Sequence, residues 1–191
     1  MEHPKVRFIS DPTSQAAYLC FVAKDIASGY YLDAQLPVLP QPQVGSIYFP
    51  NLNYPAWFWQ SINSCPNHHL DMPFPSECID YLLPLLSVVT VNTSAWADLE
   101  PRFFDLFSQL LNHKHVLETV NQITVLATPF GSHGSFYTRK QGKRINIYAT
   151  YRTDLPINIL IHTLLLALYK AHVRQDAETG TVYWRDRQNL V

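Results

Sequence analysis

The sequence is poor in charge and in long apolar runs, and each shortage excludes a class of protein. Only 15% of the residues are charged, and the formal net charge is −1. Globular proteins typically carry about 25% charged residues. A global attraction to nucleic acid or to an anionic membrane is therefore absent, so any such binding requires a local patch. No stretch reaches the roughly 18 consecutive apolar residues that a membrane span needs.

Cysteine is also scarce. Cys20, Cys65 and Cys78 are odd in number and lack CxxC spacing, which argues against a disulfide framework and favours a reducing compartment. The first residues lack the basic and then apolar pattern of a signal peptide. We therefore expect a cytoplasmic protein that has no cofactor and does not contact a membrane. Its 14 prolines, 11 tyrosines and 10 phenylalanines indicate a surface rich in neutral polar and aromatic groups. We expect another protein chain as a partner, and the alternative is a tyrosine-rich surface that has no partner.

The first part of the chain predicts a strand over residues 5–9, followed by an ambiguous segment. Residues 16–23 are apolar throughout, so periodicity cannot separate a buried strand from a buried helix. Gly29 before Tyr30 favours a turn into an extended piece. Alternating prolines then predict a connector over residues 37–43. We expect a single domain over residues 1–191, or an N-terminal part (1–36) joined by this connector to a core (44–191).

Helical signals dominate the middle of the chain. Residues 55–62 form an aromatic segment with a proline in its first turn, and Ser76 can cap a second helix that Pro84 ends or kinks. From Pro101 onward, apolar residues recur at spacings of three and four, which predicts an amphipathic helix. Its buried stripe comprises Phe103, Phe104, Phe107, Leu110 and Leu111.

Towards the C-terminus, apolar residues alternate with polar residues instead of recurring at helical spacing. This alternation predicts a strand within residues 116–128 and a hairpin with arms 135–140 and 144–150. The following segment, about 155–173, is apolar on nearly every face, which predicts a fully buried helix. The fold class is therefore α+β, with a small, mainly antiparallel sheet packed against several helices.

His162 stands in this apolar helix and is the one candidate catalytic residue. A strand, a basic hairpin and a helix with a histidine in apolar surroundings, over residues 123–172, resemble the minimal core of zincin metallopeptidases. The resemblance implies a His-Glu-x-x-His motif, whose histidines bind zinc and whose glutamate activates water. Here Thr163 stands at the glutamate position and Leu166 at the second histidine. Such a protein is a degenerate zincin without metal; the alternatives are a hydrogen-bonded core histidine and a functional histidine.

A proline-rich loop holds the candidate metal ligands. Cys65, His68, His69 and Asp71 are ligand types at short spacing. No second cluster at recognisable spacing accompanies them, and neighbouring histidines in loops are also common on solvated surfaces. Both interpretations stay open.

The predicted hairpin carries a cluster of positive charge with interleaved tyrosines and no acidic residue. Positive groups beside aromatic faces suit phosphate contact and base stacking, so the hairpin (137–152) is a candidate surface for nucleic acid or an acidic partner. Basic residues on hairpins also discourage pairing between sheet edges. The candidate binding residues are Arg139, Lys140, Lys143, Arg144, Arg152, Tyr137 and Tyr148.

Three functions remain open. The leading hypothesis is a non-catalytic interaction module within a larger intracellular assembly, on a degenerate zincin-like scaffold, because no complete catalytic constellation is visible. The second is a hydrolase whose site gathers distant residues such as His162, His133 and Cys65. The third is a nucleic-acid-associated protein that uses the basic hairpin.

Overall fold

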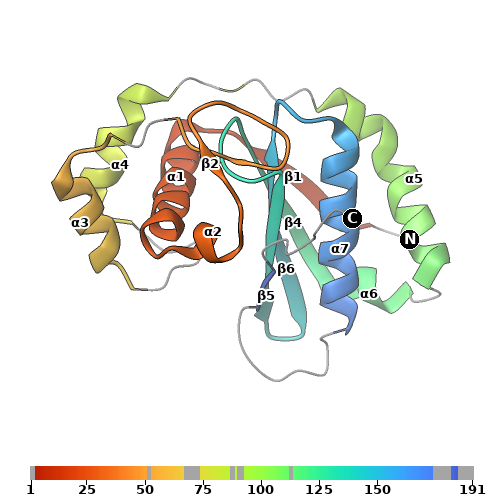
Figure 1. Cartoon of the computed structure of the whole chain (residues 1–191). Coiled ribbons are helices and arrows are strands. Elements are labelled where there is room, and N and C mark those ends of the chain that lie inside the picture. The colour runs from red at the N-terminus through yellow and green to blue at the C-terminus, as the bar shows by residue number, and fades with distance from the viewer. Residues whose placement is uncertain are drawn as a thin grey trace. The chain divides into compact units, whose positions relative to one another are not determined.

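The computed structural model describes residues 3–50, 53–66, 74–86, 89, 93–111, 114–173 and 182–184. Within these residues the fold is α+β, as predicted (Figure 1). No helix in these stretches is long and apolar enough to cross a lipid bilayer. The chain divides into two units: a sheet unit of Met1–Ile9, Val91–Ala127 and Gly134–Val191, and a helical unit of Ser10–Thr90 and Thr128–His133.

The sheet unit is built on a five-stranded sheet in the order β1-β4-β6-β5-β7. β1 runs parallel to β4, with Lys5 opposite Gln122, whereas β5 pairs antiparallel with both β6 and β7. The sheet is thus mixed, and the expectation of a mainly antiparallel sheet was slightly wrong because the β1–β4 pairing joins segments far apart in the sequence. The strands are β1 (Lys5–Ile9), β4 (Val120–Thr128), β5 (Gly134–Gln141), β6 (Arg144–Arg152) and β7 (Val182–Trp184).

The predicted hairpin is present as β5 and β6, whose register places Gln141 opposite Arg144. Gly142 in the connecting turn has a φ of 64°, which glycine adopts without steric cost. Ile145, Ile147 and Ala149 are buried, as their alternation predicts. They belong to a core formed with the helices of the same unit.

Three helices of the sheet unit are α5 (Ser94–Leu111), α6 (Lys114–Thr119) and α7 (Ile157–Val173). α5 starts before the predicted Pro101, which lies inside the helix. The earlier turn is held by Trp96, which is buried and contacts Phe103 with ring centroids 5.3 Å apart. The predicted strand beginning near residue 116 also starts later, because residues up to Thr119 form α6.

α7 is a helix, as predicted, but it is not fully buried. Leu160, Leu164 and Leu168 pack into the core of the sheet unit, and Figure 1 shows α7 lying along the sheet. His162 and Tyr169 are exposed, with Tyr169 at 47% relative accessibility. A helix has 3.6 residues per turn, so residues seven apart, such as His162 and Tyr169, lie on the same stripe of the helix. This stripe of α7 faces solvent.

In the helical unit, residues 16–23, whose apolar sequence was ambiguous, form part of a helix. α1 (Pro12–Ala27) begins at Asp11, whose side chain accepts a hydrogen bond from the Ser14 backbone N–H at 2.8 Å. Such a cap satisfies one of the free N–H groups of the first turn. The predicted extended piece after Gly29 is wrong, since residues from Tyr30 form the short helix α2 (Tyr30–Asp33).

α1 packs against the other helices of this unit. The predicted aromatic helix is present as α3, where Phe58 is buried beside Tyr54, with ring centroids 4.7 Å apart. The predicted connector contains the two-residue strand β2, which pairs parallel with β3. The remaining elements are β2 (Val38–Leu39), β3 (Ile47–Tyr48), α3 (Ala56–Ser64), α4 (Ser76–Leu82) and the 3-10 helix η1 (Leu83–Leu85).

Candidate functional site: a basic face of the sheet

The sheet has one face covered by helices and one that carries basic side chains. In β1, Val6 and Phe8 pack against the helix-covered core, whereas Lys5 and Arg7 are exposed. Successive side chains of a strand point to opposite faces. Lys5 and Arg7 therefore lie on the face opposite the helices.

The hairpin contributes to the same face. Because Phe136 and Ile145 belong to the core, alternation places Arg139, Arg144 and Tyr148 on the opposite side. Arg139 and Arg144 are exposed, and Tyr148 is half-buried. We call the set of Lys5, Arg7, Arg139, Arg144 and Tyr148 the basic face.

Neutral amides connect the basic groups of the hairpin to β4. The Arg144 guanidinium donates to Asn121 Oδ1 at 3.1 Å, and Asn121 Nδ2 donates to Asn146 Oδ1 at 3.1 Å. Asn146 Nδ2 in turn donates to Gln141 Oε1 at 3.2 Å. This network orients Arg144 without neutralising its charge.

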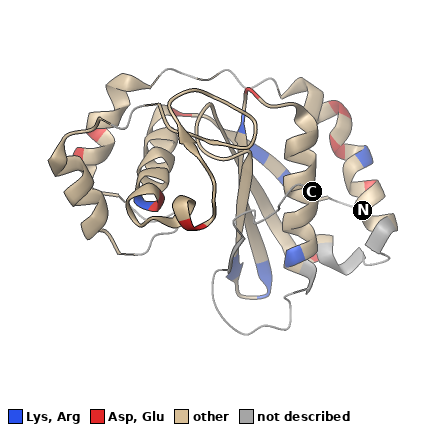
Figure 2. Ribbon diagram, viewed as in Figure 1, with Lys and Arg blue, Asp and Glu red and all other residues tan. Residues whose placement is uncertain are grey.

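The acidic residues of the sheet unit are absent from its four longer strands, whereas basic residues occur on both strands and helices. β1, β4, β5 and β6 contain no Asp, Glu, His or Cys. The described acidic residues of this unit lie on α5, on α6 and at Asp154, and Figure 2 shows basic residues on the strands and acidic residues on α5. These four strands therefore carry groups that attract anions, but no carboxylate, imidazole or thiol side chain.

The near-zero net charge of the chain conceals two oppositely charged units. The sheet unit contains thirteen Lys and Arg and nine Asp and Glu, which gives a net charge of +4. The helical unit contains one Lys and six Asp and Glu, which gives −5. The near-zero net charge of the whole chain therefore does not apply to the sheet unit, which is positively charged.

Arg152, a member of the predicted cluster, is not available to a partner. Its side chain is buried, with the residue at 1% relative accessibility. Arg152 Nε donates to Asp154 Oδ1 at 2.7 Å, and Arg152 Nη2 donates to Asp154 Oδ2 at 3.2 Å. The prediction was wrong here because an acid two residues beyond the strand forms a bidentate ion pair with this arginine.

Three further members of the cluster, Tyr137, Lys140 and Lys143, do not belong to the basic face. Tyr137 is only 2% exposed and stacks on Tyr148, with ring centroids 4.7 Å apart and planes 6° apart. Lys140 is exposed, but it lies directly opposite Ile145. Directly opposed residues share a face, so Lys140 lies on the side of the helices. Lys143 is exposed in the turn.

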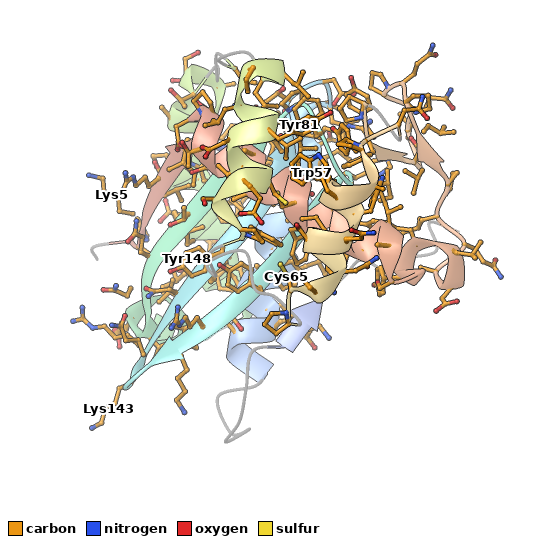
Figure 3. The ribbon with its side chains drawn as sticks, turned by 90° about the vertical axis from the view of Figure 1, so that its left-hand side faces the viewer. Lys5, Trp57, Cys65, Tyr81, Lys143 and Tyr148 are labelled. Atoms are coloured by element: carbon orange, nitrogen blue, oxygen red, sulfur yellow. The ribbon has the colours of Figure 1, made fainter. Side chains whose placement is uncertain are left out.

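Lys5 and Arg7 were missed as site residues. The alternation of charged and apolar residues in residues 5–9 predicts a strand with one polar face. Nothing local predicts that this strand pairs with β4, because its partner Gln122 lies in the other half of the chain. Figure 3 shows Lys5 and Lys143 projecting from the margin of the sheet, with Tyr148 over its strands.

His162 does not lie in apolar surroundings, because it occupies the exposed stripe of α7. Thr163, at the position of the zincin glutamate, is 6% exposed, and its hydroxyl donates to the Ile159 carbonyl at 2.8 Å. A Cβ on Gly134 would lie 2.3 Å from Thr163 Oγ1. Position 134 therefore holds glycine, because any larger side chain there would displace the strand or the helix.

The candidate metal loop is outside the described residues, since His68, His69 and Asp71 fall in the segment 67–73. Cys65 is described, and it is buried. In the part of the chain that the structure describes, no group of three or more His, Cys, Asp or Glu side chains could hold a metal ion.

Two residues of the hydrolase hypothesis, Cys65 and His133, are engaged in hydrogen bonds within the protein. Cys65 Sγ donates to the Ser61 carbonyl at 3.2 Å, and burial raises the pKa of its thiol. A thiol with a raised pKa is protonated at neutral pH and is a poor nucleophile. His133 Nε2 accepts the Gly45 backbone N–H at 2.7 Å, so this nitrogen is not free to take a proton from a substrate.

Cys20 and Cys78 are fully buried, as small hydrophobic residues would be. Burial raises the pKa of Cys20 and raises that of Cys78 to about 11. Both thiols are therefore neutral at physiological pH, and their contribution is to packing within the helical unit.

Comparisons with protein-family models, with curated proteins and with solved structures found no match for this chain.

Proposed function

We propose that this protein is a non-catalytic interaction module that contacts an anionic macromolecule through the basic face of its sheet. The observation that carries the proposal is the alignment of four basic side chains from three strands. Lys5 and Arg7 of β1 lie on the same face as Arg139 and Arg144, and the four longer strands contain no acidic residue.

Electrostatics supports this assignment. A surface of one sign attracts ligands of the opposite sign and raises their rate of association. The sheet unit has a net charge of +4, so its field favours approach of an anion. The basic face contains no acid, histidine or cysteine, which favours binding over catalysis.

Titration with fluorescently labelled heparin, a generic polyanion, tests the proposal. The double variant Lys5→Gln/Arg7→Gln should weaken binding about tenfold, because each lost phosphate-like contact removes a share of the electrostatic free energy. Lys140→Gln is the matched control, since it removes one exposed charge from the other face and should change the affinity by less than about twofold.

Two results would refute the proposal. The first is a failure of the wild-type chain to bind heparin at low salt. The second is the same loss of affinity per removed charge in Lys140→Gln and in the β1 double variant, because net charge and not the basic face would then govern binding.

The zincin-like scaffold and the larger assembly belong to the same proposal. The order of β4, the β5–β6 hairpin and α7 follows the order of elements that the resemblance implies, and the motif positions hold Thr163 and Leu166. We therefore propose a scaffold without catalytic zinc. Elemental analysis of the untagged protein tests this: stoichiometric zinc that is lost in His162→Ala would contradict it.

A further inference from the structure

We propose that single-stranded nucleic acid is the partner of the basic face, with an unpaired base stacked on Tyr148; this inference rests on the proposed function. Phosphates would meet the basic side chains, and the ring of Tyr148 would receive a base. The two kinds of contact recognise different parts of the same ligand. Together they distinguish a nucleic acid from a simple polyanion.

Tyr148 is supported as a stacking residue by the ring behind it. Tyr137 is buried and lies directly opposite Tyr148 on β5. Their rings are stacked, with planes 6° apart. Tyr148 remains half-buried, so a rigid neighbour holds a ring that retains access to solvent. Stacking of a base on such a ring costs little additional side-chain entropy, because the tyrosine is already held in place.

The charges lie on both sides of this ring along the sheet. In the strand order, β4 separates β1 from β6, and β5 follows β6. Neighbouring strands are about 4.8 Å apart, so Lys5 and Arg7 lie roughly 10 Å from the strand of Tyr148, while Arg139 lies on the next strand on the other side. A backbone that crosses the strands can contact both basic groups while one base reaches Tyr148.

The geometry favours a single strand over a duplex or an acidic protein. Bases within a duplex are stacked on one another, whereas an unpaired base can stack on an aromatic side chain. The carboxylates of an acidic protein could pair with the arginines but would leave the stacked tyrosines without a role. Asn146, two residues before Tyr148 on the same strand, is hydrogen-bonded to Asn121 and Gln141, so neutral amides join Arg144 in providing polar groups on this face.

Fluorescence anisotropy with two labelled probes tests the inference on the full chain. One probe is oligothymidylate of about twelve nucleotides, within the usual site size; the other has the same phosphodiester backbone without bases. Wild type should bind the oligothymidylate about tenfold more tightly, because stacking of a single base has roughly this value. This comparison requires no variant.

Tyr148→Leu should lower the affinity for oligothymidylate about tenfold, to that for the abasic probe, because the stacking contact is lost. Tyr148→Phe, which keeps the ring, should retain the preference. Circular dichroism and thermal unfolding establish that each variant is folded.

The outcomes separate this inference from the proposed function. Equal wild-type affinity for the two probes, with heparin still bound, overturns the inference and leaves the basic face as a polyanion site. Tighter binding of duplex DNA or of polyglutamate than of oligothymidylate also overturns it. Failure to bind any of these probes overturns both.

Discussion

Arg152 and Asp154 form a bidentate ion pair, with Nε and Oδ1 2.7 Å apart, at the point where β6 ends. The guanidinium is buried, and the pair explains why one arginine of the hairpin is absent from the basic face. Asp154 thus compensates a buried charge in the segment that leads from the sheet into α7.

Replacement of Asp154 by Asn should lower the free energy of unfolding by about 3 kcal/mol. The substitution keeps the size of the side chain but leaves a buried guanidinium without its charged partner, which is strongly destabilising. Urea unfolding measures the change. Arg144→Gln on the same strand is the control: this arginine is exposed, and its loss should change stability by less than about 0.5 kcal/mol. Equal effects of the two substitutions would contradict the role of the pair.

Gly134→Ala should destabilise the sheet unit by about 1–3 kcal/mol. The added Cβ would lie 2.3 Å from Thr163 Oγ1, and overpacking of this kind forces strand and helix apart. The double variant Gly134→Ala/Thr163→Ala should recover most of the loss because it removes the atom in conflict. Gly134→Ala/Thr163→Ser should not, since it retains the hydroxyl. Thermal unfolding of the set tests the contact, and equal rescue by both would contradict it.

Stability should fall as pH rises from about 9 to about 11, partly through Cys78. Burial raises the pKa of this thiol from the ordinary value of 9.0 to about 11. Within this window the unfolded chain releases a proton that the folded protein keeps, so deprotonation favours unfolding. Urea unfolding across the window should show a shallower loss of stability in Cys78→Ala than in wild type. An identical slope would indicate that the thiol is not responsible.

Much of the fold could be predicted where one signal dominates. The β5–β6 hairpin follows from alternation and Gly142, and α3 follows from a proline before an aromatic segment. The apolar run of α1 was ambiguous because all its faces are apolar; Asp11 followed by Pro12 is a helix-start signal that would have resolved it.

The composition of the basic face could be predicted only in part. Local alternation identifies Arg139 and Arg144, but Lys5 and Arg7 join them through a parallel pairing between distant segments. The burial of Arg152 depends on Asp154, which lies beyond the predicted strand. His162 was expected to be buried because its neighbours are apolar, although helical spacing places it on one stripe with the polar Asn158.

The affinity for oligothymidylate as a function of salt concentration tests the central claim most directly. Each phosphate contact adds about 0.7 to the slope of the logarithm of affinity against the logarithm of salt concentration for a single strand. The variant with Lys5, Arg7, Arg139 and Arg144 all changed to Gln should therefore lose about three units of slope, with its circular dichroism spectrum unchanged. A slope equal to that of wild type would contradict the basic face as the binding surface.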